Sequence, residues 1–128
     1  MVVDIFTLCD SAHEYNGKLV IIGTFDRITS DKFPMIFPEC AIVARIGFPK
    51  EEKGKHHIEI CIKKDVDELI YLLNPVSMEA DNSDTNEYSL VNVIIKGNNI
   101  LVPSSGTYKV VLKIDDEIRE SLLHVTQK

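Results

Sequence analysis

The sequence predicts an all-β protein, an antiparallel β-sandwich of the immunoglobulin-like or related Greek-key type with seven to nine strands. Three observations predict this fold. Short apolar runs with alternating or β-branched residues recur along the chain, turn residues separate them, and no stretch shows convincing helical periodicity over a long distance. A partly open β-barrel is the alternative. Because the chain has no tryptophan, the cysteine and tryptophan core of antibody domains is excluded.

The composition is that of one folded domain covering residues 1–128. Apolar residues make up 45% and charged residues 27% of the chain, whereas disordered chains are poorer in apolar residues. A net charge of −6 disfavours non-specific binding to nucleic acid, and the densest basic stretch, residues 50–64, is interleaved with glutamates. The longest apolar run, Leu69–Leu73, is far shorter than the roughly 20 residues of a membrane-spanning helix.

The N-terminal sequence and the cysteines predict a cytoplasmic protein. Residues 1–6 lack the basic region and the small-residue cleavage site of a secretory signal. The three cysteines are odd in number and evenly scattered, which favours buried, reduced thiols over a disulfide framework.

The first third of the chain contains the most apolar strand. Alternation predicts an opening strand over residues 3–9, and Ser11–Glu14 is interpreted as a tight connection with at most one helical turn. Residues 16–26 then combine an Asn-Gly turn with a dense β-branched run, so we expect a central strand that is buried on both faces. Gly23 interrupts this run, which predicts a bulge or a close backbone contact there.

The middle of the chain predicts two further strands and one ambiguous segment. Thr29–Pro38 is expected to be a covered, extended crossover, residues 40–48 a central strand, and Lys50–Lys55 a solvated turn. Residues 57–63 alternate strictly, which places Ile58, Ile60 and Ile62 in the core. Residues 66–73 fit both helical and strand spacing, and a strand is favoured because Pro75 leaves little length for a helix.

The last third predicts two hairpins after an acidic loop over residues 79–87. A strand over residues 88–95 is expected to turn at Lys96–Asn99 and to return over residues 100–102. Residues 108–114 and 118–125 then form the closing hairpin, with the turn at residues 115–117.

Several of these segments resemble a known family. The residues that carry the resemblance are 8–10, 17–19, 23–28, 57–60, 106–108, Val111, Lys113 and 115–116. The chain is similar there to small uncharacterised bacterial proteins grouped as a domain of unknown function. The resemblance implies an immunoglobulin-like β-sandwich and brings no activity, catalytic residue or ligand. The acidic insert over residues 79–87 departs from the family pattern.

Three groups of residues have the composition of candidate sites. His57, Glu59 and Cys61 share a strand face and could, with His56, ligate a transition metal, but a solvated strand face is favoured. Cys9 and His13 could pair as thiolate and base or act as two metal ligands, but a buried thiol beside a surface histidine is favoured. In the acidic loop, Asn82, Asp84 and Asn86 alternate like calcium ligands, yet Glu87 and Val93 occupy the positions where an EF-hand needs glycine and glutamate.

These patterns predict a non-catalytic module for protein interaction or structure, with no catalytic residue, no cofactor and no metal. A protein partner would bind through edge strands or through the loops over residues 29–38, 50–55 and 79–87. One alternative is a small-ligand or calcium-binding module that uses loop 79–87, and another is a thiol-dependent enzyme. The sequence leaves the oligomeric state open.

Overall fold

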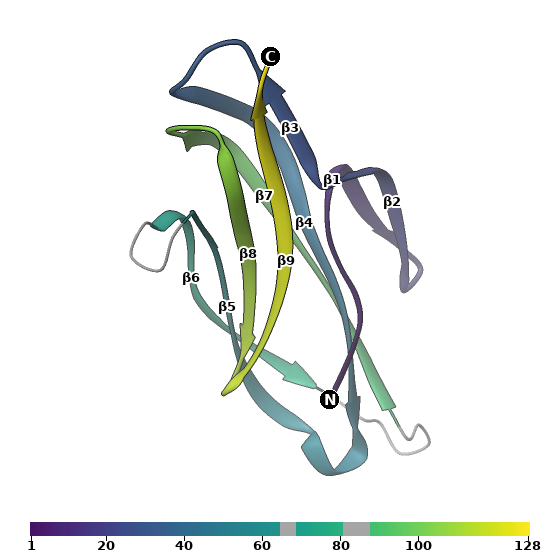
Figure 1. Cartoon of the computed structure of the whole chain (residues 1–128). Helices are drawn as coiled ribbons and strands as arrows, with labels where there is room; N and C mark the ends of the chain where they lie inside the picture. The colour runs from purple at the N-terminus through teal and green to yellow at the C-terminus, as the bar shows by residue number, and fades with distance from the viewer. Residues whose placement is uncertain (65–68, 81–87) are drawn as a thin grey trace.

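The computed structural model describes residues 1–64, 69–80 and 88–128, and these ranges contain nine strands and one short 3-10 helix (Figure 1). The elements are β1 (Val2–Tyr15), β2 (Lys18–Phe25), β3 (Arg27–Ser30), β4 (Met35–Pro49), η1 (Lys50–Glu52), β5 (Gly54–Lys63), β6 (Leu69–Ala80), β7 (Tyr88–Val102), β8 (Gly106–Ile114) and β9 (Glu117–Gln127). The predicted all-β fold is confirmed. No helix in these ranges has the length and apolar character needed to cross a membrane.

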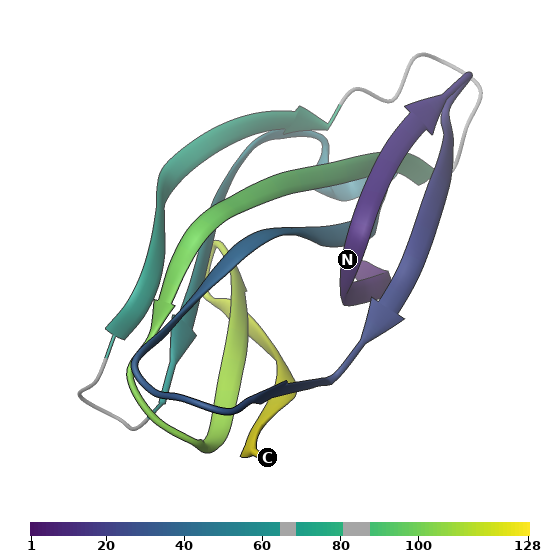
Figure 2. The same cartoon turned by 90° about the horizontal axis from the view of Figure 1, so that it is seen from above.

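The strands form two sheets that face each other (Figures 1 and 2). Sheet A has the order β2-β1-β4-β7, and sheet B has the order β3-β9-β8-β5-β6. All neighbours are antiparallel except β3 and β9, which pair in parallel from Arg27 with His124 to Ser30 with Gln127. This pair joins the third strand of the chain to its last strand.

The main core lies between the two sheets. Alternate residues of β4, β5 and β8 point into it because successive side chains of a strand lie on opposite faces. The prediction that the isoleucines of β5 face the core is confirmed, since Ile58, Ile60 and Ile62 are all buried. The prediction of a central strand over residues 40–48 is also confirmed, because β4 lies between β1 and β7.

The predicted central position of residues 16–26 is wrong. These residues form β2, which is the edge strand of sheet A and pairs only with β1. One face of β2 is partly buried, but Val20 and Ile22 on the other face are 42% and 52% exposed. The expected connection at Ser11–Glu14 is likewise a continuation of strand β1 as far as Tyr15.

The predicted turn at Lys96–Asn99 is wrong as well. Strand β7 continues through these residues and pairs with β4 in a single register from Tyr88 with Pro49 to Val102 with Met35. Asn99 does adopt a positive φ of 52°. The long partner strand outweighs the local turn preference, because alternate residues of β7 gain ladder hydrogen bonds to β4 when the strand stays extended.

Other boundaries are only partly as predicted. The crossover over residues 29–38 contains the end of β3 and the start of β4, and it is not covered, because Asp31, Lys32 and Ile36 are exposed. The turn over residues 50–55 contains the exposed helix η1. For the ambiguous segment 66–73, the strand prediction is confirmed from Leu69 onward, with Pro75 inside the edge strand β6. Residues 65–68 and 81–87, with the candidate calcium ligands, lie outside the described ranges.

Candidate functional site

Strand β1 separates from its neighbour β4 halfway along its length. Its first half, Val2–Cys9, pairs with β4, and its second half pairs only with β2. Figure 1 shows the β1–β2 hairpin bent back beside the first half of β1. We call residues 11–25 the hairpin flap, because this hairpin lies over the outer face of sheet A.

A second, smaller apolar cluster lies under the hairpin flap. Cys9 and Ala12 of β1 pack there with Ala41 and Val43 of β4, and the partly buried members are Leu19, Ile21 and Ile94. The tip of the flap is held by a relay of hydrogen bonds. Arg45 Nη1 donates to Asn92 Oδ1 over 3.1 Å, and Asn92 Nδ2 donates to the Gly17 carbonyl over 3.2 Å. The flap is therefore fixed to both β4 and β7.

The bend of the flap depends on Gly23, which approaches Asp10 of β1. Gly23 has a φ of 69°, and a Cβ atom there would lie 2.4 Å from Asp10 Oδ2 and 2.9 Å from Asp10 Cγ. Only glycine adopts this backbone conformation without strain and leaves room for the carboxylate. The predicted close contact at Gly23 is confirmed.

The bend opens a cleft of about 360 Å³ between the flap, β3 and the start of β4. Its lining residues are Asp10, Gly23, Thr24, Phe25, Arg27, Ile28, Thr29 and Phe37. Phe25 and Phe37 pack against each other, with ring centroids 5.7 Å apart. The cleft thus combines apolar side chains with a carboxylate, a guanidinium and two threonine hydroxyls, as binding sites for organic ligands and peptides do.

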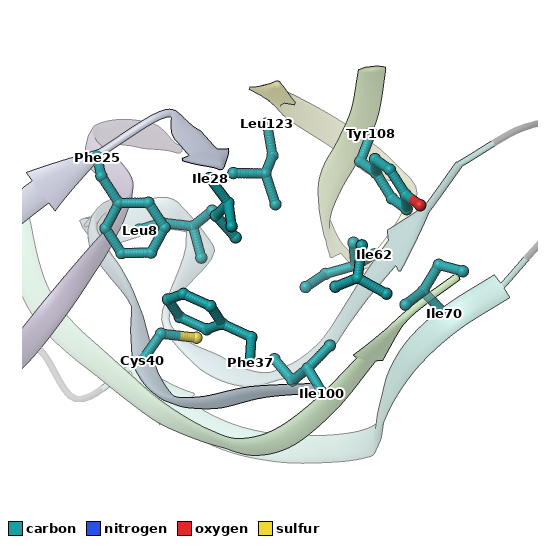
Figure 3. A pocket seen from close by; sticks show the side chains of 11 residues that line it. Leu8, Phe25, Ile28, Phe37, Cys40, Ile62, Ile70, Ile100, Tyr108 and Leu123 are labelled. Atoms are coloured by element: carbon teal, nitrogen blue, oxygen red, sulfur yellow. The ribbon is translucent and has the colours of Figure 1, made fainter. Parts of the chain in front are cut away.

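The apolar part of the cleft continues into the end of the main core. Phe25, Ile28 and Phe37 also line a small cavity of about 20 Å³, whose lining is entirely apolar in surface. In Figure 3, the side chains of Leu8, Cys40 and Tyr108 surround the same space. A side chain that entered the cleft would meet this apolar surface.

The charged residues of the cleft are not neutralised by each other. Within the described ranges, neither the Asp10 carboxylate nor the Arg27 guanidinium has a hydrogen-bond or ion-pair partner. The Thr29 hydroxyl does have a partner, because its Oγ1 lies 3.0 Å from Thr126 Oγ1 of β9. Asp10 and Arg27 are therefore available to a bound molecule.

The structure does not assemble the candidate thiol site. Cys9 is fully buried under the flap, and its Sγ donates to the Ser11 carbonyl over 3.3 Å, whereas His13 is exposed. Burial, with a smaller contribution from the charge of Asp10, raises the pKa of the Cys9 thiol. Because its pKa is raised, the Cys9 thiol stays neutral and is a weak nucleophile. Within the described ranges, no hydrogen bond joins Cys9 to His13.

The candidate metal face on β5 is also not assembled. Among the described residues, no group of three or more histidine, cysteine, aspartate or glutamate side chains could hold a metal ion. His57 is exposed, with its Nδ1 3.2 Å from Ser77 Oγ, but Cys61 is buried. The interpretation of this face as a solvated strand face is therefore confirmed at His57 and wrong at Cys61.

A histidine and aspartate pair at the other end of the sandwich has no signal in the sequence pattern. His56 Nδ1 lies 2.7 Å from Asp115 Oδ2, and His56 Nε2 lies 2.5 Å from the Glu52 carbonyl oxygen. The His56 ring stacks on Phe48, with centroids 4.1 Å apart. Since both ring nitrogens face acceptors, the doubly protonated imidazolium satisfies both contacts.

This pair makes the stability of the fold depend on pH. Burial alone would lower the pKa of His56, but the bonds to Asp115 and Glu52 outweigh it, so the pKa is raised above 6.5. The bond to His56 and the bond from the His57 amide lower the pKa of Asp115 below 3.8. The His56 contribution is thus present below pH 6.5 and lost as pH rises through its folded pKa, and the Asp115 contribution is lost as pH falls below 3.8.

We therefore expect His56→Gln to lower the Tm most between about pH 4 and pH 6.5. The difference in Tm from the wild type should shrink as the pH is raised to about 9. Thermal unfolding followed by circular dichroism across this range measures it, and the exposed His13→Gln variant controls for the loss of any histidine. A difference in Tm that stays constant from pH 5 to pH 9 would contradict the expectation.

The comparisons with known proteins agree with the resemblance seen in the sequence. The profile of a family of unknown function, DUF6941, matches residues 4–126. The chain belongs to this family. The cleft and the hairpin flap described above all lie within the part of the chain that matches DUF6941. No curated protein matches the chain.

Two solved structures resemble the fold over 95% of the chain. They are the β-glucosidase from Listeria innocua in complex with gluconolactone, with a TM-score of 0.49 and 11% identity, and the same enzyme in complex with isofagomine, with a TM-score of 0.48 and 13% identity. The chain spans 16% of the length of that enzyme. A likeness of this degree says nothing about the function of a DUF6941 protein.

Proposed function

We propose that this chain is a non-catalytic interaction module that binds its partner at the cleft beside the hairpin flap. The observation that carries the proposal is the composition of that cleft. Its apolar side chains, Phe25, Ile28 and Phe37, continue into the core, and its charged side chains, Asp10 and Arg27, have no partner within the described ranges. An apolar floor with a few polar groups at its rim is the usual composition of a recognition site.

The state of the thiols supports a non-catalytic role in a reducing compartment such as the cytoplasm. Cys9, Cys40 and Cys61 are all free and buried. Burial raises the pKa of each of these thiols, for Cys40 to about 11. Buried thiols with raised pKa values act as apolar packing residues, and they persist unpaired in a reducing compartment.

Site-specific photo-crosslinking in the cell of origin tests the proposal. A photo-reactive amino acid is placed at Thr24 on the rim of the cleft and, as a matched control, at Thr107 on β8, because both threonines are exposed. Discrete adducts are expected from position 24 and not from position 107. Adducts only at position 107, equal adducts at both positions, or none at position 24 would refute binding at the cleft.

A further inference from the structure

The departure of β1 leaves part of β4 with a partner on one side only. Strand β4 pairs with β7 along its whole length, Met35–Pro49. It pairs with β1 only from Ala41 to Gly47, because β1 leaves the sheet after Cys9. Within the described ranges, residues 35–40 therefore have no ladder on the side where β1 would have continued. At about 3.3 Å per residue, this edge is roughly 20 Å long.

The cleft lies along this unpaired edge. Phe37, the third residue of the edge, lines the cleft, and Asp10 and Gly23 line it at the point where β1 turns away. A strand edge with free N–H and C=O groups is a template for another strand, and natural proteins usually cover or shorten such edges. Here the edge is bordered by a cleft and the apolar surface of Phe25 and Ile28.

We propose that an extended peptide segment of the partner adds to residues 35–40 of β4 as a further strand of sheet A. This inference rests on the proposed binding at the cleft and names the partner chemistry. The segment lies beside residues 35–40 of β4, where β1 would lie if it continued straight. It runs antiparallel to β4, as β1 and β7 do. Main-chain hydrogen bonds provide affinity in this mode, and side-chain pockets provide specificity.

The geometry specifies the sequence of the added segment. Its side chains alternate between the interior and the solvent, so every second residue is apolar and meets Phe25, Ile28 or Phe37. Pro38 lies within the edge and has no N–H to donate, which reduces the number of ladder bonds that the edge can form.

The charges beside the edge indicate at which end of the added peptide segment a basic residue would bind. Antiparallel pairing places the amino-terminal end of the segment beside Cys40, next to the bend at Asp10. Asp10 and Glu39 line a second pocket of about 80 Å³ at this end, together with His13 and Lys96. Because Asp10 also lines the cleft and has no partner within the described ranges, a lysine or arginine at the amino-terminal end of the segment is complementary to it.

The probe is the peptide acetyl-Lys-Val-Thr-Val-Thr-Val-amide, titrated into the whole chain and followed by amide NMR. Bound peptide is expected to slow hydrogen exchange of the backbone amides within residues 35–40. N-methylation of one alternate set of peptide amides should weaken binding more than about tenfold, and of the other set less than about threefold, because only one set faces β4. Equal effects of both sets would overturn strand addition.

Two variants test the charge complementarity. Asp10→Asn is expected to weaken binding of the peptide by about two- to fivefold, which is the upper part of the range for an exposed charge pair. Arg27→Gln, which removes a cation from the same cleft, should not weaken it. The reverse order of effects would overturn the assignment of Asp10, and the Tm of each variant shows that it remains folded.

The two proposals fail in different ways. Crosslinked adducts at Thr24 without slowed exchange at residues 35–40 would keep the cleft as the binding site and overturn strand addition. Slowed exchange confined to β8 and β9, on the other sheet, would refute both. Protection at residues 35–40 with the alternating N-methyl pattern would establish the mode of binding even if the cellular partner differs in sequence from the probe.

Discussion

Replacing Phe48 with alanine is expected to lower the free energy of unfolding by about 3 to 5 kcal/mol, the range for large aromatic residues removed from a core. Phe48 is fully buried near the end of β4 and belongs to the main core between the sheets. The variant loses this burial and also the stacking of the ring on His56. Urea unfolding followed by circular dichroism measures the change.

The control for Phe48 is Ile118→Ala on β9, because Ile118 is 53% exposed. This control should change the free energy of unfolding by no more than about 0.5 kcal/mol. The Phe48 variant should also show a weaker dependence of stability on pH, since His56 loses the ring that holds it beside Asp115. A loss below about 1 kcal/mol would mean that the end of the sandwich repacks around the missing ring.

The strands that face the core on one side were predictable from the sequence. In β5, Ile58, Ile60 and Ile62 alternate with polar residues, and this period of two identifies both the strand and its buried face. The turn before β9 was also predictable from local sequence, because Asp115 adopts a positive φ of 53°, which aspartate tolerates. Both signals depend only on neighbouring residues.

The order of the strands was not predictable in the same way. Residues 19–25 are apolar on both faces, which is typical of a central strand, but one face covers the second apolar cluster and the other is exposed. Lys96–Asn99 has the composition of a turn, yet β4 is long enough to keep β7 extended through it. In both cases the outcome depends on a partner strand distant in sequence.

The cleft could not be predicted because it is assembled from four separate segments. Asp10, residues 23–25, residues 27–29 and Phe37 meet only because β1 bends out of sheet A. The interruption of an apolar run by Gly23 was the one local signal of this bend. The pair of His56 and Asp115 had no such signal, since His56 lies in strand β5 and Asp115 lies in the turn between β8 and β9, 59 residues away in the sequence.

Gly23→Val is expected to lower the free energy of unfolding by about 2 to 4 kcal/mol, from backbone strain and overpacking together. A β-branched residue at a φ of 69° is strained by roughly 1 to 3 kcal/mol, and its Cβ would overlap the Asp10 carboxylate at 2.4 Å. To relieve the overlap, Asp10 must move or the bend must open. Because the flap covers Cys9, Ala41 and Val43, opening the bend would also expose part of the second apolar cluster.

The matched control is Gly17→Val at the tip of the same hairpin. Gly17 has a similar φ of 77°, but a Cβ there would have no heavy atom within 4 Å. This variant therefore experiences backbone strain without the overlap, and the difference between the two variants measures the contact with Asp10. Adding Asp10→Ala to Gly23→Val should recover part of that difference, and equal losses at Gly17 and Gly23 would show that close packing at Asp10 does not hold the bend.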